Sequence, residues 1–167
     1  MTTARPQKTA IIGAAGLVGR HLLEAQRRFH PDVVGTDWRG RENLTPLDLA
    51  QPDIRPLRLA QTGHTWAAIA AGVSPLSVCE HEKASTHKKN VVGALTLAAQ
   101  LAEAGLKVIF FSSDAVFNGE RGDYGDDSPL NPINEYGRQK QETELRLPQA
   151  TRGRCLILRI GRVVGSR

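Results

Sequence analysis

At 167 residues the chain can bury one substantial core, and its two cysteines and five histidines lack the spacing of a disulfide framework or a metal site. No run approaches the roughly 20 apolar residues of a membrane span, and residues 1–8 are polar, without the apolar stretch of a signal peptide. The net charge of +5 arises from Arg146 onward, where six arginines meet no acid, so no nucleic-acid-binding stripe is indicated. We expect a cytoplasmic protein of one domain, residues 1–167, that contacts neither nucleic acid nor membrane.

The first predicted element is a short apolar strand, residues 10–12, followed at once by three glycines spaced G-x-x-G-x-x-G. Gly13 permits a sharp turn, Gly16 lets the backbone approach a pyrophosphate, and Gly19 lets the next helix pack closely on the strand. That helix, residues 17–29, would offer N–H groups and the positive end of its dipole to phosphates. A plain turn is the alternative interpretation, and the strand and helix on either side favour a dinucleotide site.

The second predicted strand, residues 33–36, leads to an acidic residue. Asp37 lies 18 residues after Gly19, where a carboxylate can accept hydrogen bonds from an adenosine ribose. A solvated loop aspartate is the alternative. Because Asp37 would repel a 2′-phosphate while Arg39 and Arg41 soften that rejection, we expect a moderate preference for NAD(H) over NADP(H).

Strands and helices then alternate along the chain. We predict a short third strand or extended segment at 44–49, a short helix or turn between Pro52 and Pro56, a strand at 66–73, a helix at 82–104, a strand at 107–112, a long loop at 114–132, a helix at 136–147 and a strand at 155–160. Periodicity leaves 66–73 ambiguous between strand and helix, and the loop residues that follow it favour a strand. The order predicts an α/β fold, a Rossmann-like doubly wound parallel sheet with ligands at the carboxyl ends of its strands.

A second constellation of polar side chains lies near the end of the chain. Tyr136 and Lys140 place a phenol and an ammonium on one face of the predicted helix. The lysine charge favours the phenolate, so in a site shielded from water we expect the tyrosine to act as an acid or base near neutral pH. A surface pair is the alternative for this spacing alone, and Ser113, at the end of the strand at 107–112, favours a catalytic site.

Several motifs occur in a fixed order: the glycine stretch, Val78-Cys79-Glu80, Asn90-Val91-x-Gly93, residues 112–119, Pro129-x-x-Pro132, Tyr136-Gly137-x-x-Lys140-x-x-x-Glu144 and Leu158-Arg159. With them the chain resembles the extended short-chain dehydrogenase/reductase family over essentially its whole length, most of all its dTDP-4-dehydrorhamnose reductase branch. Ala115 departs from that pattern, because the branch usually has an aromatic residue there. Family members also continue into a substrate-binding lobe, which we expect this chain largely to lack.

The resemblance implies a role for each matching residue. Tyr136 would be the proton donor to a sugar ketone, Lys140 its activator and a cofactor-ribose ligand, and Ser113 the hydroxyl that polarises the carbonyl. Asn90 would hold its helix and a water in place. Arg159 and Arg162 are candidates for binding a diphosphate. The implied cofactor contacts are Gly13, Ala15, Gly16, Leu17, Val18, Gly19, Asp37, Trp38, Arg39, Asp48, Leu49, Ala70, Ala71, Gly72, Ser112, Tyr136 and Lys140.

The resemblance implies NAD(P)-dependent reduction of a nucleotide-linked 4-keto-sugar, with NAD(H), or else NADP(H), as cofactor and a nucleotide-sugar as the small-molecule partner. A sugar-nucleotide epimerase or dehydratase and a non-catalytic NAD(P)-binding regulatory subunit both stay open, and so does a homodimer. Retention of Ser113, Tyr136 and Lys140 favours an enzyme, whereas the missing lobe favours a regulatory subunit. We expect the 167 residues alone to bind dinucleotide but to catalyse poorly.

Overall fold

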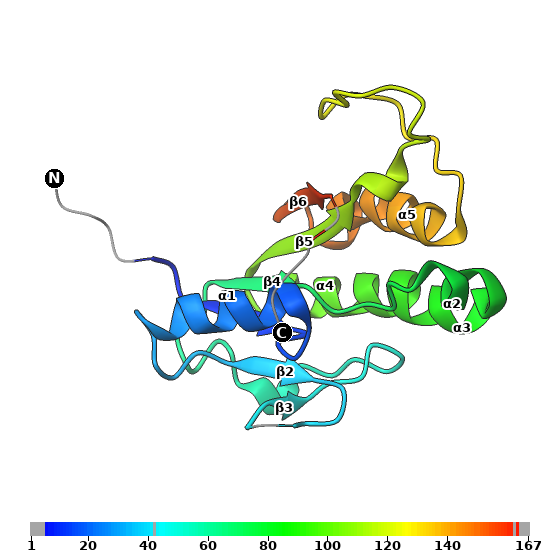
Figure 1. Ribbon diagram of the computed structural model, residues 1–167. Helices are drawn as coiled ribbons and strands as arrows, with labels where there is room; N and C mark the ends of the chain where they lie inside the picture. The colour runs from blue at the N-terminus through cyan, green and yellow to red at the C-terminus, as the bar shows by residue number, and fades with distance from the viewer. Residues whose placement is uncertain (1–5, 42, 162, 164–167) are drawn as a thin grey trace, which may run out of the picture.

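The computed structural model describes residues 6–41, 43–161 and 163, and these residues form a sheet of six parallel strands (Figure 1). The strands are β1 (Thr9–Ile12), β2 (Gly35–Asp37), β3 (Thr45–Pro46), β4 (Trp66–Ile69), β5 (Lys107–Ser113) and β6 (Cys155–Ile160). Their order across the sheet is β3-β2-β1-β4-β5-β6. This is the strand order of a dinucleotide-binding sheet, and the predicted α/β doubly wound fold is confirmed.

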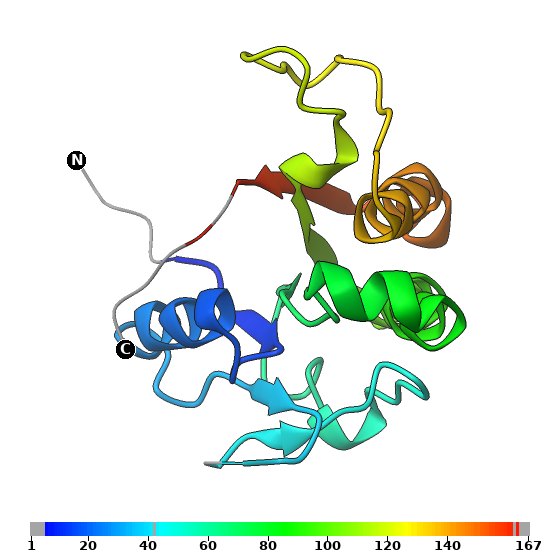
Figure 2. The same ribbon diagram turned by 45° about the vertical axis from the view of Figure 1, so that its right-hand side comes forward.

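Helices cover the two faces of the sheet unequally. They are α1 (Leu17–Arg27), α2 (Leu76–His81), α3 (Lys83–His87), the π-helical η2 (Lys88–Gly93), α4 (Ala94–Glu103) and α5 (Glu135–Ala150), with short 3₁₀ turns η1 (Arg55–Leu57) and η3 (Asp114–Val116). Figure 2 shows α1 on one side of the sheet and α4 and α5 on the other. In the part of the chain that the structure describes, no helix is long and apolar enough to cross a bilayer.

Two buried clusters form the core, one on each face of the sheet. Alternate strand residues point to opposite faces, so Ile11 packs with Leu23 on the α1 side while Ile12 packs with Leu97 on the α4 side. The α4 side holds the larger cluster, which includes the fully buried Phe110 of β5. The strands are therefore buried on both faces around β1, β4 and β5, as their apolar sequences predict.

The loops that shape the site follow the carboxyl ends of β1 and β4. From β1 the sheet grows toward β2 and β3 on one side and toward β4, β5 and β6 on the other, and ligands bind where the strand order switches in this way. Gly13 has φ of +88°, and a Cβ there would lie 2.7 Å from the backbone of Ala71. A Cβ at Gly19 would lie 2.1 Å from the carbonyl oxygen of Gly13. Glycine at both positions thus lets the loop after β1, the loop after β4 and the start of α1 pack against one another.

The predicted strands are found, although several bounds differ. The ambiguous segment at 66–73 is a strand only to Ile69, and the extended segment at 44–49 contributes just Thr45–Pro46, paired in parallel with β2. The predicted turn near Pro56 is η1. The first helix ends at Arg27, two residues short of its predicted end, where the chain turns toward Pro31.

The predicted helix at 82–104 is wrong at its start. Helix α2 already begins at Leu76, with Pro75 as its N-cap, and a break at Glu82 separates it from α3. Proline lacks an N–H that a first helical turn leaves unpaired anyway, so it can precede a helix as well as end a loop. Near the other end of the chain, α5 continues past its predicted end at Leu147 to Ala150. Pro148 lies in the last turn of the helix, and the buried Thr151 hydroxyl donates to the Leu147 carbonyl oxygen there.

Candidate active site

A pocket of about 510 Å³ opens at the carboxyl ends of β1, β2 and β4, and we call it the β2–β4 pocket. The glycine loop, the end of β2 and the loop after β4 form its walls. Its lining residues are Gly13, Gly16, Thr36, Asp37, Trp38, Leu47, Asp48, Leu49, Ala70, Ala71, Gly72, Val73, Pro75 and Lys89. Most of the residues proposed to contact the adenosine half of a dinucleotide thus line one pocket.

Asp37 is nearly buried in this pocket, and its carboxylate is held by the loop that follows it. Arg41 Nε donates to Asp37 Oδ2 over 3.0 Å, and the Arg39 N–H donates to the same oxygen over 3.3 Å. The Arg41 hydrogen bond holds the pKa of Asp37 below its usual value, so the carboxylate is charged at neutral pH. The Arg39 guanidinium lies 4.1 Å from the ring centroid of the exposed Trp38. Trp38 lines the pocket, whereas Arg39 does not.

A second pocket of about 540 Å³, the β5–α5 pocket, lies beside the first and shares Gly16 and residues 70–72 with it. Its walls come from the start of α1, the end of β5 and the start of α5. The residues that line it are Gly16, Leu17, Val18, Ala70, Ala71, Gly72, Ser74, Leu76, Phe111, Ser112, Ser113, Asp114, Ala115, Tyr136, Lys140, Ile160, Gly161 and Val163. The fold therefore brings Ser113, Tyr136 and Lys140 together from β5 and α5.

Tyr136 is largely buried, and its environment keeps the phenol protonated. Burial raises the pKa of Tyr136, the nearby Cys79 thiol adds to this effect, and a hydrogen bond with Ser113 opposes it. The Ser113 hydroxyl also donates to Asp114 Oδ1 over 3.0 Å and accepts from the Ala115 N–H over 3.2 Å. The Tyr136–Lys140 spacing predicts that the lysine favours the phenolate, whereas in the folded protein desolvation of the phenol is the larger effect and raises the pKa of Tyr136.

The position of the Lys140 ammonium explains why it does not lower the pKa of Tyr136 as predicted. Its Nζ donates to the Phe111 carbonyl oxygen over 2.7 Å and lies 4.4 Å from the Phe110 ring centroid and 5.7 Å from the Tyr136 ring centroid. The ammonium thus faces the plane of the tyrosine ring. Burial lowers the pKa of Lys140 to about 8, while Glu144 partly offsets that effect. The lysine is still mainly charged at neutral pH.

Ser112 carries the one buried side-chain oxygen that lacks a hydrogen-bond partner among the described residues. The residue is 2% exposed and lines the β5–α5 pocket. Buried hydroxyls are normally paired, so an unpaired one at a pocket wall is a position where a ligand group can bind.

Four proposed site residues lie outside the linings of both pockets, and these are Ala15, Gly19, Arg39 and Asn90. Ala15 is exposed in the glycine loop, and Gly19 packs the helix against that loop. Asn90 lies behind the loop after β4, where its side chain bonds Val73. These four residues do not line either pocket, and their predicted roles as cofactor contacts, or for Asn90 in catalysis, stay predictions.

Sequence reasoning overlooked other residues at or near the site. Thr36 lines the β2–β4 pocket, and its Oγ1 accepts from the Gly13 N–H over 3.2 Å. Its position directly before Asp37 was the available signal.

Arg159 was a candidate for binding a diphosphate, but its guanidinium is engaged with the buried carboxylate of Glu144, with Nη2 to Oε2 at 2.8 Å. Arg162 lies outside the described residues. No group of three or more potential metal ligands gathers anywhere in the described chain.

Comparison with known proteins places this geometry in a context. The sequence profile of the family described as the RmlD substrate binding domain matches residues 7–167. The methionine adenosyltransferase 2 subunit beta of Xenopus tropicalis is 31% identical over 164 residues, which cover 96% of this chain and 48% of that protein. The UDP-glucose 4-epimerase of Azospirillum brasilense is 31% identical over 178 residues, covering 98% of this chain and 51% of the epimerase.

A similar solved structure is that of a hypothetical dTDP-4-dehydrorhamnose reductase from Sulfolobus tokodaii, with a TM-score of 0.79 and 26% identity. The match covers 93% of this chain and 56% of the Sulfolobus chain. The chain therefore spans about half the length of the relatives it matches.

Proposed function

This chain belongs to the RmlD substrate binding domain family, and from that premise we propose that it binds NAD(H) or NADP(H) and reduces a nucleotide-linked 4-keto-sugar. The observation that carries the proposal is the adjacency of the two pockets. Asp37 and Asp48 line one pocket, Ser113 and Tyr136 line the other, and residues 70–72 form a wall of both. A dinucleotide lying across this wall would have its adenosine at the acidic residues and its nicotinamide at the tyrosine.

The residues present fit such a cofactor. The close packing of Gly13 on Ala71 leaves a bare backbone at the pocket floor, and Gly16, at the N-cap of α1, lies in the wall of both pockets. Asp37 offers a charged acceptor for ribose hydroxyls. The unpaired Ser112 hydroxyl at the other end offers a polar atom that a bound ligand would satisfy.

The proposed chemistry divides between cofactor and protein. The reduced nicotinamide, when bound, supplies a hydride to the carbonyl carbon of the sugar. Tyr136, kept protonated by its burial, would give its proton to the ketone oxygen. The Ser113 hydroxyl would turn its single proton from Asp114 Oδ1 to the same ketone oxygen. The positive charge of Lys140, 5.7 Å from the centre of the Tyr136 ring, would then offset part of the negative charge on the phenolate that remains.

The experiment that tests this proposal is a panel of nucleotide-linked 4-keto-sugars incubated with the protein and NADH or NADPH. The proposal predicts that at least one compound causes stoichiometric loss of reduced cofactor and formation of the matching alcohol. If cofactor binds but none is consumed with any compound, either by this chain or by this chain joined to the second half of a family member, reduction of a keto-sugar is wrong as the function.

Two other functions are favoured by particular relatives. The resemblance to the methionine adenosyltransferase 2 subunit beta favours a regulatory subunit, for which NADH would bind without any turnover. The resemblance to the UDP-glucose 4-epimerase favours an epimerase, for which sugar products would form without net consumption of NADH. The same panel separates both from the reductase, provided that sugar products are measured beside the cofactor.

A further inference from the structure

Two buried side chains, Asn90 and Cys79, hold the loop after β4 at Val73, and the Cys79 Sγ donates to the Val73 carbonyl over 3.4 Å. Asn90, in η2, accepts a hydrogen bond from the Val73 N–H over 2.7 Å and donates one to the Val73 carbonyl over 2.9 Å. Asn90 is 4% exposed, and Val73 closes the loop whose residues 70–72 wall both pockets. The amide of Asn90 is therefore the group that bonds both the N–H and the carbonyl of Val73 at the end of this wall.

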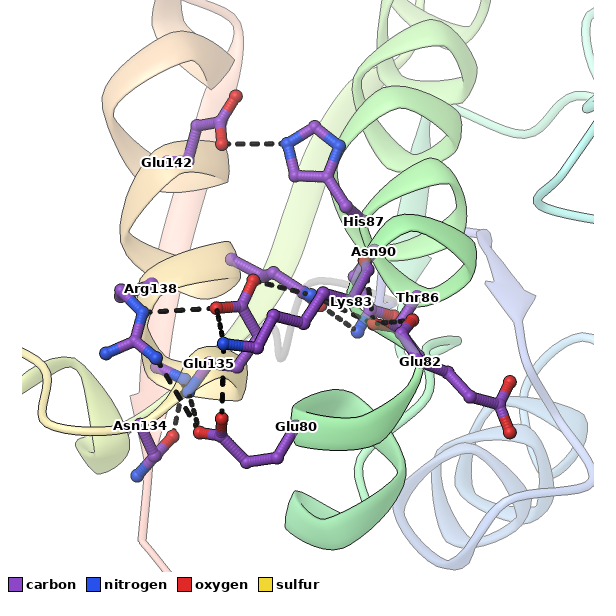
Figure 3. Close-up of polar contacts among 12 residues, drawn as sticks. Glu80, Glu82, Lys83, Thr86, His87, Asn90, Asn134, Glu135, Arg138 and Glu142 are labelled. Carbon is purple, nitrogen blue, oxygen red and sulfur yellow. Dashed lines mark hydrogen bonds and ion pairs between the residues drawn. The ribbon is translucent and has the colours of Figure 1, made fainter.

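A second buried amide completes the hydrogen bonding of the first. Gln139, 1% exposed on α5, accepts from Asn90 Nδ2 over 2.8 Å through its Oε1. Its Nε2 donates to Thr86 Oγ1 over 2.9 Å and to Glu135 Oε1 over 3.2 Å. Figure 3 shows this part of the molecule, where α5 lies against α3 and η2. Both amides thereby use their acceptor and both of their donor hydrogens.

Gln139 sits between Tyr136 and Lys140 on the same helix. One turn further along α5, the Thr143 hydroxyl shares its proton between the Gln139 carbonyl oxygen, at 2.9 Å, and the Asn90 carbonyl oxygen, at 3.1 Å. Buried hydrogen bonds thus run from Gln139 on α5 to Asn90 on η2 and on to Val73 in the loop after β4. They connect the helix that carries Tyr136 and Lys140 to the backbone that forms a wall of the β5–α5 pocket.

We propose that Gln139 is a positioning residue, which holds the loop at residues 70–73 and the helix of Tyr136 in one fixed relation. The inference rests on the proposed function, since the cofactor would lie against this loop and the substrate against Tyr136. A shift of the loop would misplace the cofactor relative to the proton donor, and small misplacements reduce rates strongly.

The chemistry of the site explains why an amide suits position 139. A carboxylate there would face Glu135 and could not donate to Thr86. A methionine of similar size would leave one Asn90 hydrogen with only the distant Cys79 sulfur, 3.9 Å from Nδ2, as a weak acceptor. A buried donor without a partner is unfavourable, so Asn90 would rotate or admit water and release Val73. The loop would then lose its fastening without losing its packing.

The test compares Gln139→Met with Gln100→Met. Gln100 also ties two segments, because its side chain donates to the Pro52 carbonyl over 2.8 Å and accepts from the Ile54 N–H over 3.2 Å, away from both pockets. NADH affinity is measured by fluorescence titration and stability by thermal unfolding. We expect Gln139→Met to weaken NADH binding about tenfold, while Gln100→Met lowers stability and leaves NADH affinity within about twofold of wild type.

A double-mutant cycle distinguishes positioning from a general loss of order. Because Gln139 acts through Asn90, the pair Asn90→Ala with Gln139→Met should bind NADH no more weakly than Asn90→Ala alone. Additive losses of affinity would overturn the proposal, and so would a Gln139→Met protein that binds NADH within about twofold of wild type. If Gln139→Met does not fold, Thr86→Val, which removes only the far end of the path, should still weaken NADH binding measurably, and unchanged affinity there would also overturn it.

The turnover assay keeps this inference separate from the proposed function. Where a keto-sugar is reduced, Gln139→Met should lower kcat while leaving KM for the sugar within about twofold, because Gln139 lies behind the pocket wall. Where no sugar is reduced by the wild-type chain, alone or joined to the second half of a family member, the proposed reductase function fails, whereas the NADH titration still decides the role of Gln139.

Discussion

Asp37 places a buried carboxylate, kept ionised by its hydrogen bond from Arg41, in the β2–β4 pocket. We predict that the protein binds NADH more tightly than NADPH, since a 2′-phosphate would meet this carboxylate. Asp37→Ser should shift the ratio of the two affinities toward NADPH by about tenfold or more. Titrations of both cofactors measure the shift.

The control for this prediction is Asp53→Asn, which removes an exposed carboxylate paired with Arg55 outside both pockets and should leave the ratio unchanged. A wild-type protein that clearly prefers NADPH would contradict the prediction. In that case Arg39 and Arg41, rather than Asp37, would define the selectivity of the pocket.

Residues that act through local spacing could be predicted from the sequence, and residues that act through distant partners could not. Tyr136 and Lys140 lie one helical turn apart, so their shared face follows from helix geometry, and both do line the β5–α5 pocket. Asn90 and Thr86, which bond Gln139, come from other elements, as does Glu144, which bonds Arg159, and only the fold reveals these contacts. The raised pKa of Tyr136 was not predictable either, because burial in the folded protein causes it.

At the scale of elements, His64 links the segment before β2 to the turn before β4. The Val34 N–H donates to His64 Nε2 over 3.2 Å, so Nδ1 carries the proton toward Thr62 Oγ1, at 2.8 Å. Burial lowers the pKa of His64 to about 4, and the positive charge of Lys8 adds to the effect. Protonation of His64 at Nε2 would remove the lone pair that accepts the hydrogen bond from the Val34 N–H.

This arrangement predicts acid-sensitive stability. The folded protein keeps His64 neutral to about pH 4, whereas an unfolded histidine binds its proton near pH 6.5, so the unfolded state binds more protons between these values. The free energy of unfolding should therefore fall as pH drops from about 6.5 to about 4.

Denaturant unfolding across this range measures the effect as the difference between wild type and His64→Gln, which keeps an acceptor but does not titrate. The pH dependence of the variant should be flatter, and that of His21→Gln, at an exposed histidine, should match wild type. Equal slopes for wild type and His64→Gln would show that His64 is not the group responsible.

The strands were easier to predict than the helices that flank them. The strands β1, β4, β5 and β6 are short apolar segments bounded by glycine, proline or polar residues, and local sequence identifies them. The break between α2 and α3 has no such signal, since Glu82 is an ordinary helical residue whose backbone leaves helical geometry only in the fold. The same holds for η2, whose π-helical turns place Asn90 at the loop after β4.

At the scale of the whole molecule, the 167 residues contain both pockets but span about half the length of the relatives. We predict that they bind NADH by themselves yet reduce a keto-sugar slowly, because few groups would orient the sugar nucleotide or exclude water from Tyr136. Joining the chain to the second half of a family member should raise kcat/KM while leaving NADH affinity similar. Equal turnover with and without the added half would contradict this, and would mean that the sugar site is complete within these residues.

The most direct test of the account is NADH oxidation by the joined chain carrying Tyr136→Phe. The substitution removes only the hydroxyl that gives its proton to the ketone oxygen, so we predict a loss of kcat of about a hundredfold or more with nearly unchanged NADH affinity. Tyr124→Phe, which removes the hydroxyl bonded to Asn118 in the loop at 114–132, serves as the control and should retain turnover. Near-normal turnover by Tyr136→Phe would contradict the central claim, because Tyr136 would then be a packing residue and the proton would come from another group.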